Sequence, residues 1–225
     1  MTLTPNVPIV ITVKGTNTQS YTHRFEKPFD SLFHEAMADT LKYLCSQIGG
    51  ASFGYTQGDT ISVLVADYKK QIIDAQYLSS MASSIATYHF NNEFNQLYLD
   101  GLSEHGEFEE VDMAHDLARR VGLLFHARVC NIAENDVYGY FLNQQRAANN
   151  YAIEKVFETF FPNSKIQYPD NKARMIALKN NGIDIKTQYD VKFYRGVGCR
   201  RNGFNWVFEK EMPVLTKEYL DIWIR

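Results

Sequence analysis

Residues Gly50–Val65 read Gly-Ala-Ser-Phe-Gly-Tyr-Thr-Gln-Gly-Asp-Thr-Ile-Ser-Val-Leu-Val, and the rest of the chain can be arranged around the hairpin that they predict. Two short β-prone runs, Ser52–Thr56 and Thr60–Val65, flank Gln57-Gly58-Asp59, the kind of corner that closes a hairpin. Such a corner can hold a carboxylate at the rim of a sheet, where a cation or a phosphate reaches it. Gly-Asp is also ordinary turn chemistry, in which the Asp only caps the turn. The neighbouring elements therefore decide between these two interpretations of Asp59.

A strand and a helix are predicted before the hairpin. Residues Pro8–Lys14 form a near-continuous run of apolar and β-branched residues, which is typical of a buried central strand, and Gly15 ends it. Residues 16–27 are polar and irregular and predict a loop. Asp30 then fits the N-cap of a helix that Gly49-Gly50 ends. One face of this helix is apolar, because apolar residues recur at three- and four-residue spacing: Phe33, Met37, Leu41, Leu44 and Ile48.

A second helix, a polar segment and a further strand follow the hairpin. The helix is predicted from about Asp74 to Phe90, and the acidic residues 96–111 are interpreted as a surface excursion. Asp112–Arg120 favours a short helix, and Leu123–Ile132 alternates as a strand does. Residues 1–132 thus predict an α+β fold of the ferredoxin-like βαββαβ type, with an antiparallel sheet backed by two helices.

Residues 133–225 predict a second part, a helical and β-hairpin extension packed on the first. A long helix is expected over Asp136–Phe161, followed by a linker at 162–169 and a short helix over Lys172–Asn180. Val191–Phe208 favours one or two strands around the turn Asn202-Gly203. The chain therefore divides at residue 132 in this interpretation.

Composition limits the class of protein. The chain has 225 residues, a formal charge of -3, 14 tyrosines and 15 phenylalanines, so a large domain with a substantial core fits and a strongly basic nucleic-acid binder does not. It has no run of 18 apolar residues for a membrane span and no signal-peptide pattern. The three cysteines, Cys45, Cys130 and Cys199, are far apart and odd in number, so neither a disulfide framework nor a zinc cluster is predicted. We expect a cytoplasmic protein without membrane contact.

The predicted topology brings the end of the first strand close to the hairpin corner. Nucleic-acid polymerases of the palm type place one carboxylate at each of these positions, and the pair holds two metal ions. Here Asp59 supplies one carboxylate, whereas Lys14 occupies the other position. An ammonium cannot coordinate Mg²⁺ and repels it. Lys14 can instead hold a phosphate as a point charge, which predicts a neutral or positive pocket.

Six segments of the chain occur in the order in which one enzyme family has them. They are Glu26-Lys27-Pro28-Phe29-Asp30 with His34-Glu35-Ala36-Met37, then Phe53–Ser62, then Ser80, Ser84, Ala86, Thr87, Phe90 and Asn91 on one helix, then Phe125-His126-Ala127-Arg128-Val129, then Tyr140-Phe141 with Gln145 and Ile153, and last Phe193-Tyr194-Arg195-Gly196. Through them, residues 8–201 resemble the tRNA-His guanylyltransferase family and its tRNA guanylyltransferase-like members. The resemblance implies a palm domain that adds nucleotides to a tRNA 5′ end in the 3′-to-5′ direction.

The chain departs from the family pattern at positions that carry its chemistry. The family's first-strand motif Asp-Gly-Arg/Lys-x-Phe-His is replaced by Lys14-Gly15-Thr16-Asn17-Thr18-Gln19, and the acid after the hairpin Asp is replaced by Thr60. Further family residues are replaced by Tyr77, His126, Asn143-Gln144-Gln145, Ala147 and Tyr151. Of the metal ligands that the resemblance implies, Asp59 remains.

A group of basic and aromatic residues near the C-terminus suits phosphate contacts and base stacking. It consists of Lys192, Arg195, Arg200 and Arg201, with Phe193 and Tyr194 between them. A solvated strand edge is the alternative, since positive charges there discourage aggregation. With the resemblance, the candidate site has Asp59 as the catalytic and metal-binding residue and the following nucleotide-binding residues: Lys14, Gly15, Gly58, Ser80, Arg128, Lys192, Arg195 and Arg200.

These residues leave two hypotheses for the function. The first is a nucleotidyltransferase that adds GTP to a tRNA 5′ end with Mg²⁺ held partly by Asp59, and with a second carboxylate from elsewhere, such as Asp67 or another subunit. The second is a catalytically degenerate palm protein that binds GTP or ATP, or tRNA or another RNA, without two-metal catalysis. The resemblance also implies a homo-oligomer, a dimer or tetramer, with the aromatic residues around Tyr138–Phe141 as a candidate contact surface.

Overall fold

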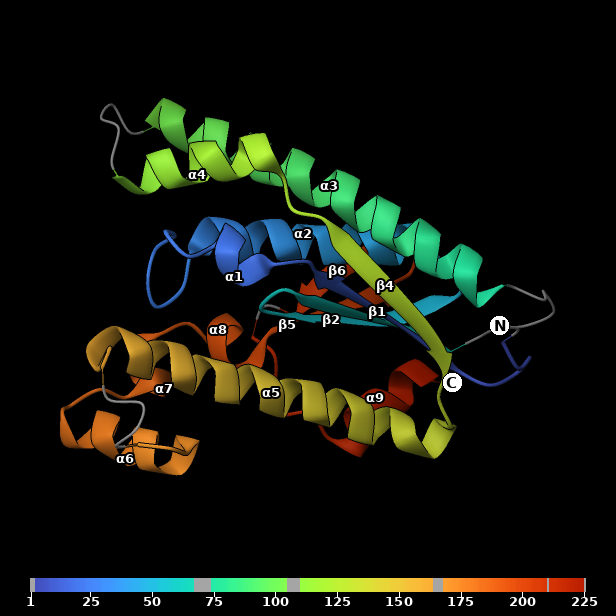
Figure 1. Cartoon of the computed structure of the whole chain (residues 1–225). Coiled ribbons are helices and arrows are strands. Elements are labelled where there is room, and N and C mark those ends of the chain that lie inside the picture. Colours follow the sequence, from blue (N-terminus) through green and yellow to red (C-terminus); the bar gives the residue numbers. More distant parts are fainter. Residues whose placement is uncertain (1–2, 67–73, 105–109, 164–167, 210, 225) are drawn as a thin grey trace.

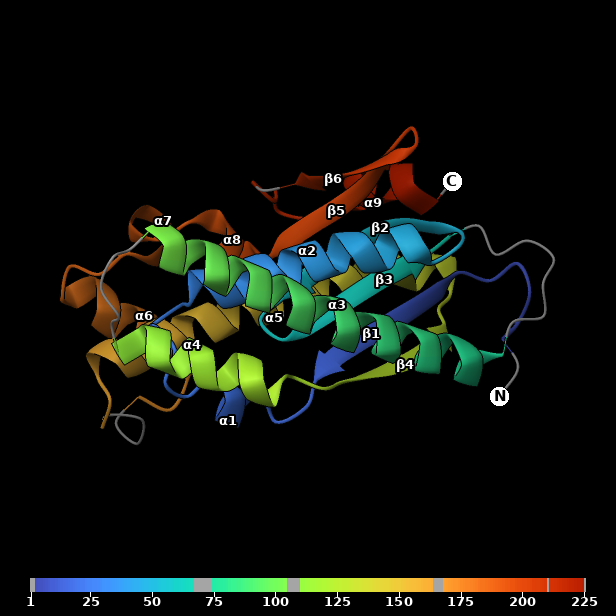
Figure 2. The ribbon, with the colours of Figure 1, turned by 90° about the horizontal axis from the view of Figure 1, so that it is seen from above.

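The computed structural model describes residues 3–66, 74–104, 110–163, 168–209 and 211–224. Its centre is an antiparallel six-stranded sheet with the order β4-β1-β3-β2-β5-β6 (Figures 1 and 2). The strands are β1 (Ile9–Gly15), β2 (Ala51–Gln57), β3 (Thr60–Val65), β4 (Phe125–Asn131), β5 (Val197–Asn202) and β6 (Asn205–Glu209). The predicted α+β class is confirmed.

The first strand lies inside the sheet, as predicted. β1 pairs with β3 on one side and with β4 on the other, both antiparallel. Ile9, Ile11 and Val13 belong to the hydrophobic cluster on one face of the sheet, whereas Val10 belongs to the cluster on the other face. Because β1 is buried on both faces, its sequence is a continuous apolar run and does not alternate with polar residues.

Helices cover both faces of the sheet (Figure 1). On one face lie α2 (Ser31–Gln47) and α3 (Ala75–Glu104), with α4 (Glu110–Val121) beside α3, and on the other lie α5 (Glu134–Phe160) and α9 (Lys217–Ile224). The remaining helices are α1 (Thr18–Tyr21), α6 (Asn171–Asn180), α7 (Ile185–Gln188) and α8 (Val191–Arg195). The main elements of residues 9–131 follow the predicted order strand, helix, strand, strand, helix, strand. In the part of the chain that is described, no helix is long and apolar enough to cross a membrane.

The prediction of a surface excursion after the second helix was wrong for residues 96–104. α3 continues through them and ends at Glu104. Its buried side chains include Phe90, Phe94 and Tyr98, which recur every four residues. This apolar stripe packs on the rest of the layer and carries the helix past Phe90, so the polar composition of residues 96–104 misplaced the end of the helix.

The C-terminal strands join the same sheet. β5 pairs with β2, so that Phe53 stands opposite Arg200, and β6 pairs with β5. Residues 191–195 form α8, and the prediction of a strand there was wrong. The adjacent rings of Phe193 and Tyr194 both pack into the hydrophobic cluster around Val156 and Phe157 of α5, whereas neighbouring side chains of a strand would point to opposite faces.

The aromatic residues of α5 that were expected at a subunit contact are used inside the chain. Phe141 is fully buried against Phe53 and the rest of the cluster on that face. The hydroxyl of Tyr140 is hydrogen-bonded to the hydroxyls of Thr12 at 2.8 Å and Ser62 at 2.9 Å. These side chains therefore fix α5 to the middle of the sheet and place its C-terminal half beside the β2–β3 corner.

Candidate functional site

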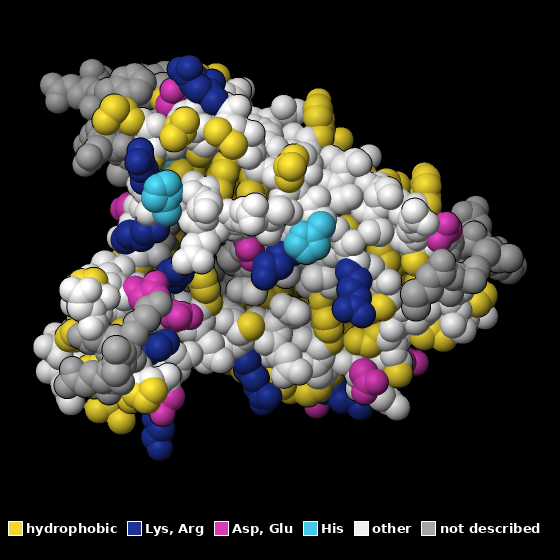
Figure 3. Space-filling model, viewed as in Figure 1, with side chains coloured by type: hydrophobic (Ala, Val, Ile, Leu, Met, Phe, Trp, Pro, Cys, Tyr) yellow, Lys and Arg dark blue, Asp and Glu magenta, His cyan; other side chains and the backbone are white. Residues whose placement is uncertain are grey.

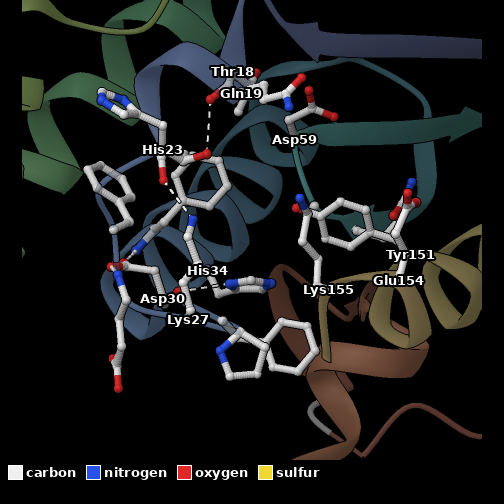
Figure 4. Close-up of a pocket in the computed structure, with 18 of the residues that line it drawn as sticks. Thr18, Gln19, His23, Lys27, Asp30, His34, Asp59, Tyr151, Glu154 and Lys155 are labelled. Carbon is white, nitrogen blue, oxygen red and sulfur yellow. Dashed lines mark hydrogen bonds between the residues drawn. The ribbon is translucent and has the colours of Figure 1, made fainter. Parts of the chain in front are cut away.

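A cavity of about 800 Å³ lies where the β2–β3 corner, α1, the segment before α2 and α5 meet. Figure 3 shows a hollow on the left of the molecule, around which basic, acidic and histidine side chains gather. In the close-up, polar side chains from all of these elements surround one space (Figure 4). This polar cavity is the best candidate for a functional site in the described part of the chain.

The end of β1 and the hairpin corner are joined at the edge of the cavity. The backbone N–H of Gly15 donates to the carbonyl oxygen of Asp59 at 3.0 Å, and Lys14 is paired with Thr60 in the sheet. A Cβ atom on Gly15 would collide with Thr18 Oγ1, so a larger residue here would require the Thr18 side chain to move. The predicted meeting of the two segments is therefore confirmed.

The side chain of Asp59 reaches the cavity from a turn that needs glycine. Gly58 has φ of 51°, in the left-handed region, where side chains other than glycine are strained. Thr60 Oγ1 donates to Asp59 Oδ1 at 3.1 Å, which orients the carboxylate. Lys14, Gly58 and Asp59 all line the cavity.

The opposite wall of the cavity comes from α5, which sequence reasoning did not assign to the site. Tyr151, Glu154, Lys155 and Glu158 line it, and Figure 4 shows the first three of them across from Asp59. Burial, followed by the charge of Asp59, raises the pKa of Tyr151 to about 12. The ammonium of Lys155 lies 5.4 Å from the centre of the Tyr151 ring and 3.3 Å from Glu158 Oε2. Two signals were available: the resemblance, which set Ala147 and Tyr151 at replaced family positions, and the spacing of Ala147, Tyr151, Glu154 and Glu158, which places them on one helix face.

A second lysine shares the cavity with Lys155. Lys27 precedes α2, and its ammonium donates to the carbonyl oxygen of Thr22 at 3.1 Å. Burial and the positive charge of Lys155 lower the pKa of Lys27, although Asp30 and Glu158 act in the opposite direction. The carboxylates of Asp30 and Glu158 offset part of the repulsion between the two ammonium groups, and an anion bound between the lysines would offset more of it.

Asp30, which also lines the cavity, is occupied by structural hydrogen bonds. Its carboxylate accepts from the backbone N–H of Phe33 at 2.8 Å as the N-cap of α2, and from His115 Nε2 at 2.7 Å. Burial alone would raise the pKa of Asp30, but the hydrogen bonds and the charge of His115 outweigh burial and lower it. Because His115 lies on α4, this buried pair fastens α4 to the start of α2.

Comparison with known sequences places the chain in a family. A sequence model of the family "Thg1: tRNAHis guanylyltransferase" matches residues 1–132, which is more than half of the chain. The chain belongs to this family. The match contains β1, the hairpin, α3 and β4, and therefore both segments that meet at Asp59.

Solved structures of the family share the fold over nearly the whole chain. A bacterial tRNA(His) guanylyltransferase (Thg1)-like protein in complex with ATP has a TM-score of 0.84 at 24% identity, covering 100% of this chain and 93% of that one. A bacterial Thg1-like protein in complex with GTP has a TM-score of 0.72 at 22% identity, with 100% and 92% covered. The tRNA(His) guanylyltransferase of Saccharomyces cerevisiae has a TM-score of 0.72 at 12% identity, with 98% and 94% covered.

A viral relative is also similar in sequence. An uncharacterised protein of Acanthamoeba polyphaga mimivirus is 26% identical over 191 residues, which is 78% of this chain. The match spans 63% of the length of the viral protein, less than two thirds of it. Because the viral protein is itself uncharacterised, this similarity gives no information on activity.

The structure brings some of the predicted site residues of this Thg1-family chain together and leaves others apart. Among the described residues, the cavity lining includes Lys14, Gly58 and Asp59, with Gly15 beside them, and does not include the other five. Ser80 on α3 and Arg128 on β4 are exposed. Lys192 lies 3.8 Å from Glu35, Arg195 donates to the carbonyl oxygen of Met212 at 3.3 Å, and Arg200 forms an ion pair with Glu209.

The residues at the corner do not fit the two-metal centre that palm chemistry implies. Such a centre needs two carboxylates that bridge a pair of ions, and Lys14 stands where the second would be. Asp67, considered as a replacement, lies outside the described residues. The expected neutral or positive pocket is also wrong for the lining as a whole, because it has five carboxylates and three lysines: Glu26, Asp30, Asp59, Glu154 and Glu158 against Lys14, Lys27 and Lys155.

Proposed function

We propose that this chain binds a nucleoside triphosphate in the cavity beside Asp59, as a member of the Thg1 family with an incomplete metal centre. The observation that carries the proposal is the junction of β1 with the hairpin corner. There the backbone hydrogen bond from Gly15 to Asp59 holds Lys14 at the edge of the cavity. In this proposal residues 1–132 are the palm-like domain, and residues 133–225 are an extension that closes the cavity with α5.

Three lysines of the lining are proposed to hold the triphosphate. Lys14 takes the place of a bridging carboxylate, and Lys27 and Lys155 approach from the segment before α2 and from α5. A phosphate oxygen about 4 Å from an ammonium gains about 1 kcal/mol in water and several times more in a partly desolvated site. The repulsion between Lys27 and Lys155 would be relieved by the same anion.

An unpartnered hydroxyl supports a polar ligand at this place. Thr18 lines the cavity, and its Oγ1 is buried without a hydrogen-bond partner in the described part of the structure. Buried polar atoms are nearly always hydrogen-bonded, so an atom of this kind at a cavity wall suits a bound ligand with polar groups.

The proposal is supported by relatives of the same fold. The two bacterial Thg1-like structures are described as complexes with ATP and with GTP, so proteins of this fold bind both nucleotides. A second candidate function is the family reaction itself, addition of GTP to a tRNA 5′ end. It is favoured by Asp59 at the corner and by the family match over residues 1–132.

Equilibrium binding tests the proposal. GTP and ATP are titrated into the native chain, once with Mg²⁺ and once with EDTA, and into the variants Lys14→Ala and Lys172→Ala. Lys172 is an exposed lysine on α6 and serves as the matched control. We expect Lys14→Ala to weaken binding about tenfold, or about 1.4 kcal/mol, in both buffers, and Lys172→Ala to leave it unchanged. Equal affinity in the two variants would overturn the proposal.

A further inference from the structure

A group of three metal-ligating side chains lies between α2 and α3, outside the cavity. Asp39 comes from α2, and His89 and Glu93 come from α3. Since His89 and Glu93 are four residues apart, they stand on the same face of α3 and face the same stretch of α2. One ligand atom from each residue lies within 4.8 Å of the other two.

Two contacts hold the histidine of this group in place. His89 Nε2 lies 2.9 Å from Asp39 Oδ2, and the imidazole is stacked on the ring of Tyr43, with 4.1 Å between centres and 5° between planes. Tyr43 is one turn further along α2 than Asp39, so the same helix supplies a carboxylate for the ring nitrogen and a platform for the ring face. Little reorganisation is left for the imidazole when it binds a ligand.

The charges of the group are unbalanced. Two carboxylates share a half-buried place with one imidazole, and no Lys or Arg of the described residues is paired with Asp39 or Glu93. A bound cation would neutralise both carboxylates at once.

We propose that Asp39, His89 and Glu93 form a site for a divalent cation of the zinc type, which clamps α2 to α3. Zinc binds His nitrogen and carboxylate oxygen at about 2.0–2.2 Å in a tetrahedron, so its ligand atoms stand about 3.3 Å from one another. The distance of 2.9 Å between the His89 nitrogen and the Asp39 oxygen is already within a few tenths of that value. A rotamer adjustment of Glu93 completes a three-residue site, with water as the fourth ligand.

The chemistry of the donors selects this class of cation. An imidazole nitrogen suits zinc and neighbouring transition metals, whereas Mg²⁺ and Ca²⁺ prefer oxygen ligands alone. None of the three residues lines the nucleotide cavity, so the site is separate from the proposed function. Because α2 and α3 together cover one face of the sheet, a metal here stabilises the helix layer and takes no part in chemistry at Asp59.

The test measures metal binding by the full chain after removal of metals with EDTA and dialysis. Zn²⁺ is titrated calorimetrically, and Co²⁺ is added as a probe because tetrahedral Co²⁺ absorbs strongly in the visible range. The variants are His89→Gln and Glu93→Gln, with His126→Gln, an exposed histidine of β4, as the control. We expect Zn²⁺ at a hundred times its dissociation constant to raise the melting temperature by about 5 °C or more.

The variants decide the outcome. His89→Gln and Glu93→Gln are each expected to weaken Zn²⁺ binding at least tenfold and to abolish the Co²⁺ spectrum. The control His126→Gln should bind Zn²⁺ and Co²⁺ as the native chain does, and added Mg²⁺ should not alter Zn²⁺ binding or the Co²⁺ spectrum. Circular dichroism in EDTA checks that each variant is folded. If His89→Gln is unfolded, the metal binding of Glu93→Gln alone decides the outcome. Absence of Zn²⁺ binding by the native chain, or equal binding by Glu93→Gln, would show that the group is only a hydrogen-bonded contact between helices and would overturn the proposal.

Discussion

Two aspartates line the same cavity and differ in how many hydrogen bonds the folded chain gives them. Asp30 is buried, caps α2 and accepts a hydrogen bond from His115, so its charge is used to hold helices together. Asp59 stands half-buried at a hairpin corner, where its described side-chain hydrogen bond comes from the neighbouring Thr60. The difference shows that residue type and proximity to a cavity do not define a functional carboxylate. A carboxylate is available to a ligand only if the folded chain leaves some of its hydrogen-bonding capacity unused.

The largest expected effect separates the two aspartates by stability. Asp30→Ala removes the N-cap of α2, which costs about 1 kcal/mol, and leaves the buried ring nitrogen of His115 without its partner, which costs about 1–3 kcal/mol, so the free energy of unfolding should fall by about 2–4 kcal/mol. Asp59→Ala, at a half-exposed corner, should cost less than about 1 kcal/mol. Urea unfolding of both variants at neutral pH measures the two values. Comparable losses would mean that Asp59 is structural as well.

The next prediction extends the comparison to the basic residues. Lys155 lines the cavity, whereas Arg200 pairs with Glu209 between β5 and β6. Lys155→Ala should therefore weaken GTP binding about threefold to tenfold, or about 1 kcal/mol, and Arg200→Ala should leave it within about twofold. Titration with a fluorescent GTP analogue measures both. A larger loss in Arg200→Ala than in Lys155→Ala would place the phosphate site at the C-terminal strands.

A glycine at the Asp59 corner gives a smaller effect. Gly58 has a positive φ, so Gly58→Ala should cost about 1 kcal/mol of stability and displace the Asp59 carboxylate. Gly49 is the matched control, because it is exposed and a Cβ atom there would point into open space, so Gly49→Ala should cost a few tenths of a kcal/mol at most. Thermal melting of the two alanine variants compares them, and equal shifts would contradict the role given to the turn.

The smallest effect concerns pH. The pKa of Asp30 is lower in the folded chain than its ordinary value of 3.8, so its ionised form is favoured by folding. The stability that Asp30 contributes is fully present above pH 3.8 and is lost as the pH falls through the lower pKa of the folded state. Asp30→Asn should flatten this part of the curve of unfolding free energy against pH, measured by urea unfolding between about pH 2 and 5. A native curve as flat as that of the variant would contradict the lowered pKa.

The sequence was informative where burial leaves a periodic pattern. β1 was predicted because its apolar residues are buried on both faces, and the hairpin because Gly58-Asp59 interrupts two β-prone runs. From these two elements the meeting of Lys14 with the Asp59 corner could be predicted, since sheet pairing fixes it.

The rest of the site depends on contacts between distant segments. The resemblance set Tyr151 at the position of a replaced family residue, but Lys155 looks like a residue of an ordinary amphipathic helix, and the packing of α5 on the sheet brings both to the cavity. Likewise, the predicted turn at Asn202-Gly203 does not show that Arg200 forms an ion pair with Glu209, because Glu209 is paired with Gly198 in the sheet and lies diagonal to Arg200. The residue type of a charged side chain therefore does not show whether the tertiary structure supplies its ion-pair partner.

Transfer of labelled GTP to a tRNA 5′ end, measured beside GTP binding with Mg²⁺ and with EDTA, distinguishes a nucleotide-binding junction at Lys14 and Asp59 from a two-metal transferase. For a junction without a two-metal centre, we expect GTP binding that EDTA changes little, weak or absent transfer by the native chain, and little effect of Asp59→Asn on binding. Robust Mg²⁺-dependent transfer by the native chain, lost in Asp59→Asn, would contradict it and would require a second carboxylate from another part of the chain or from another subunit.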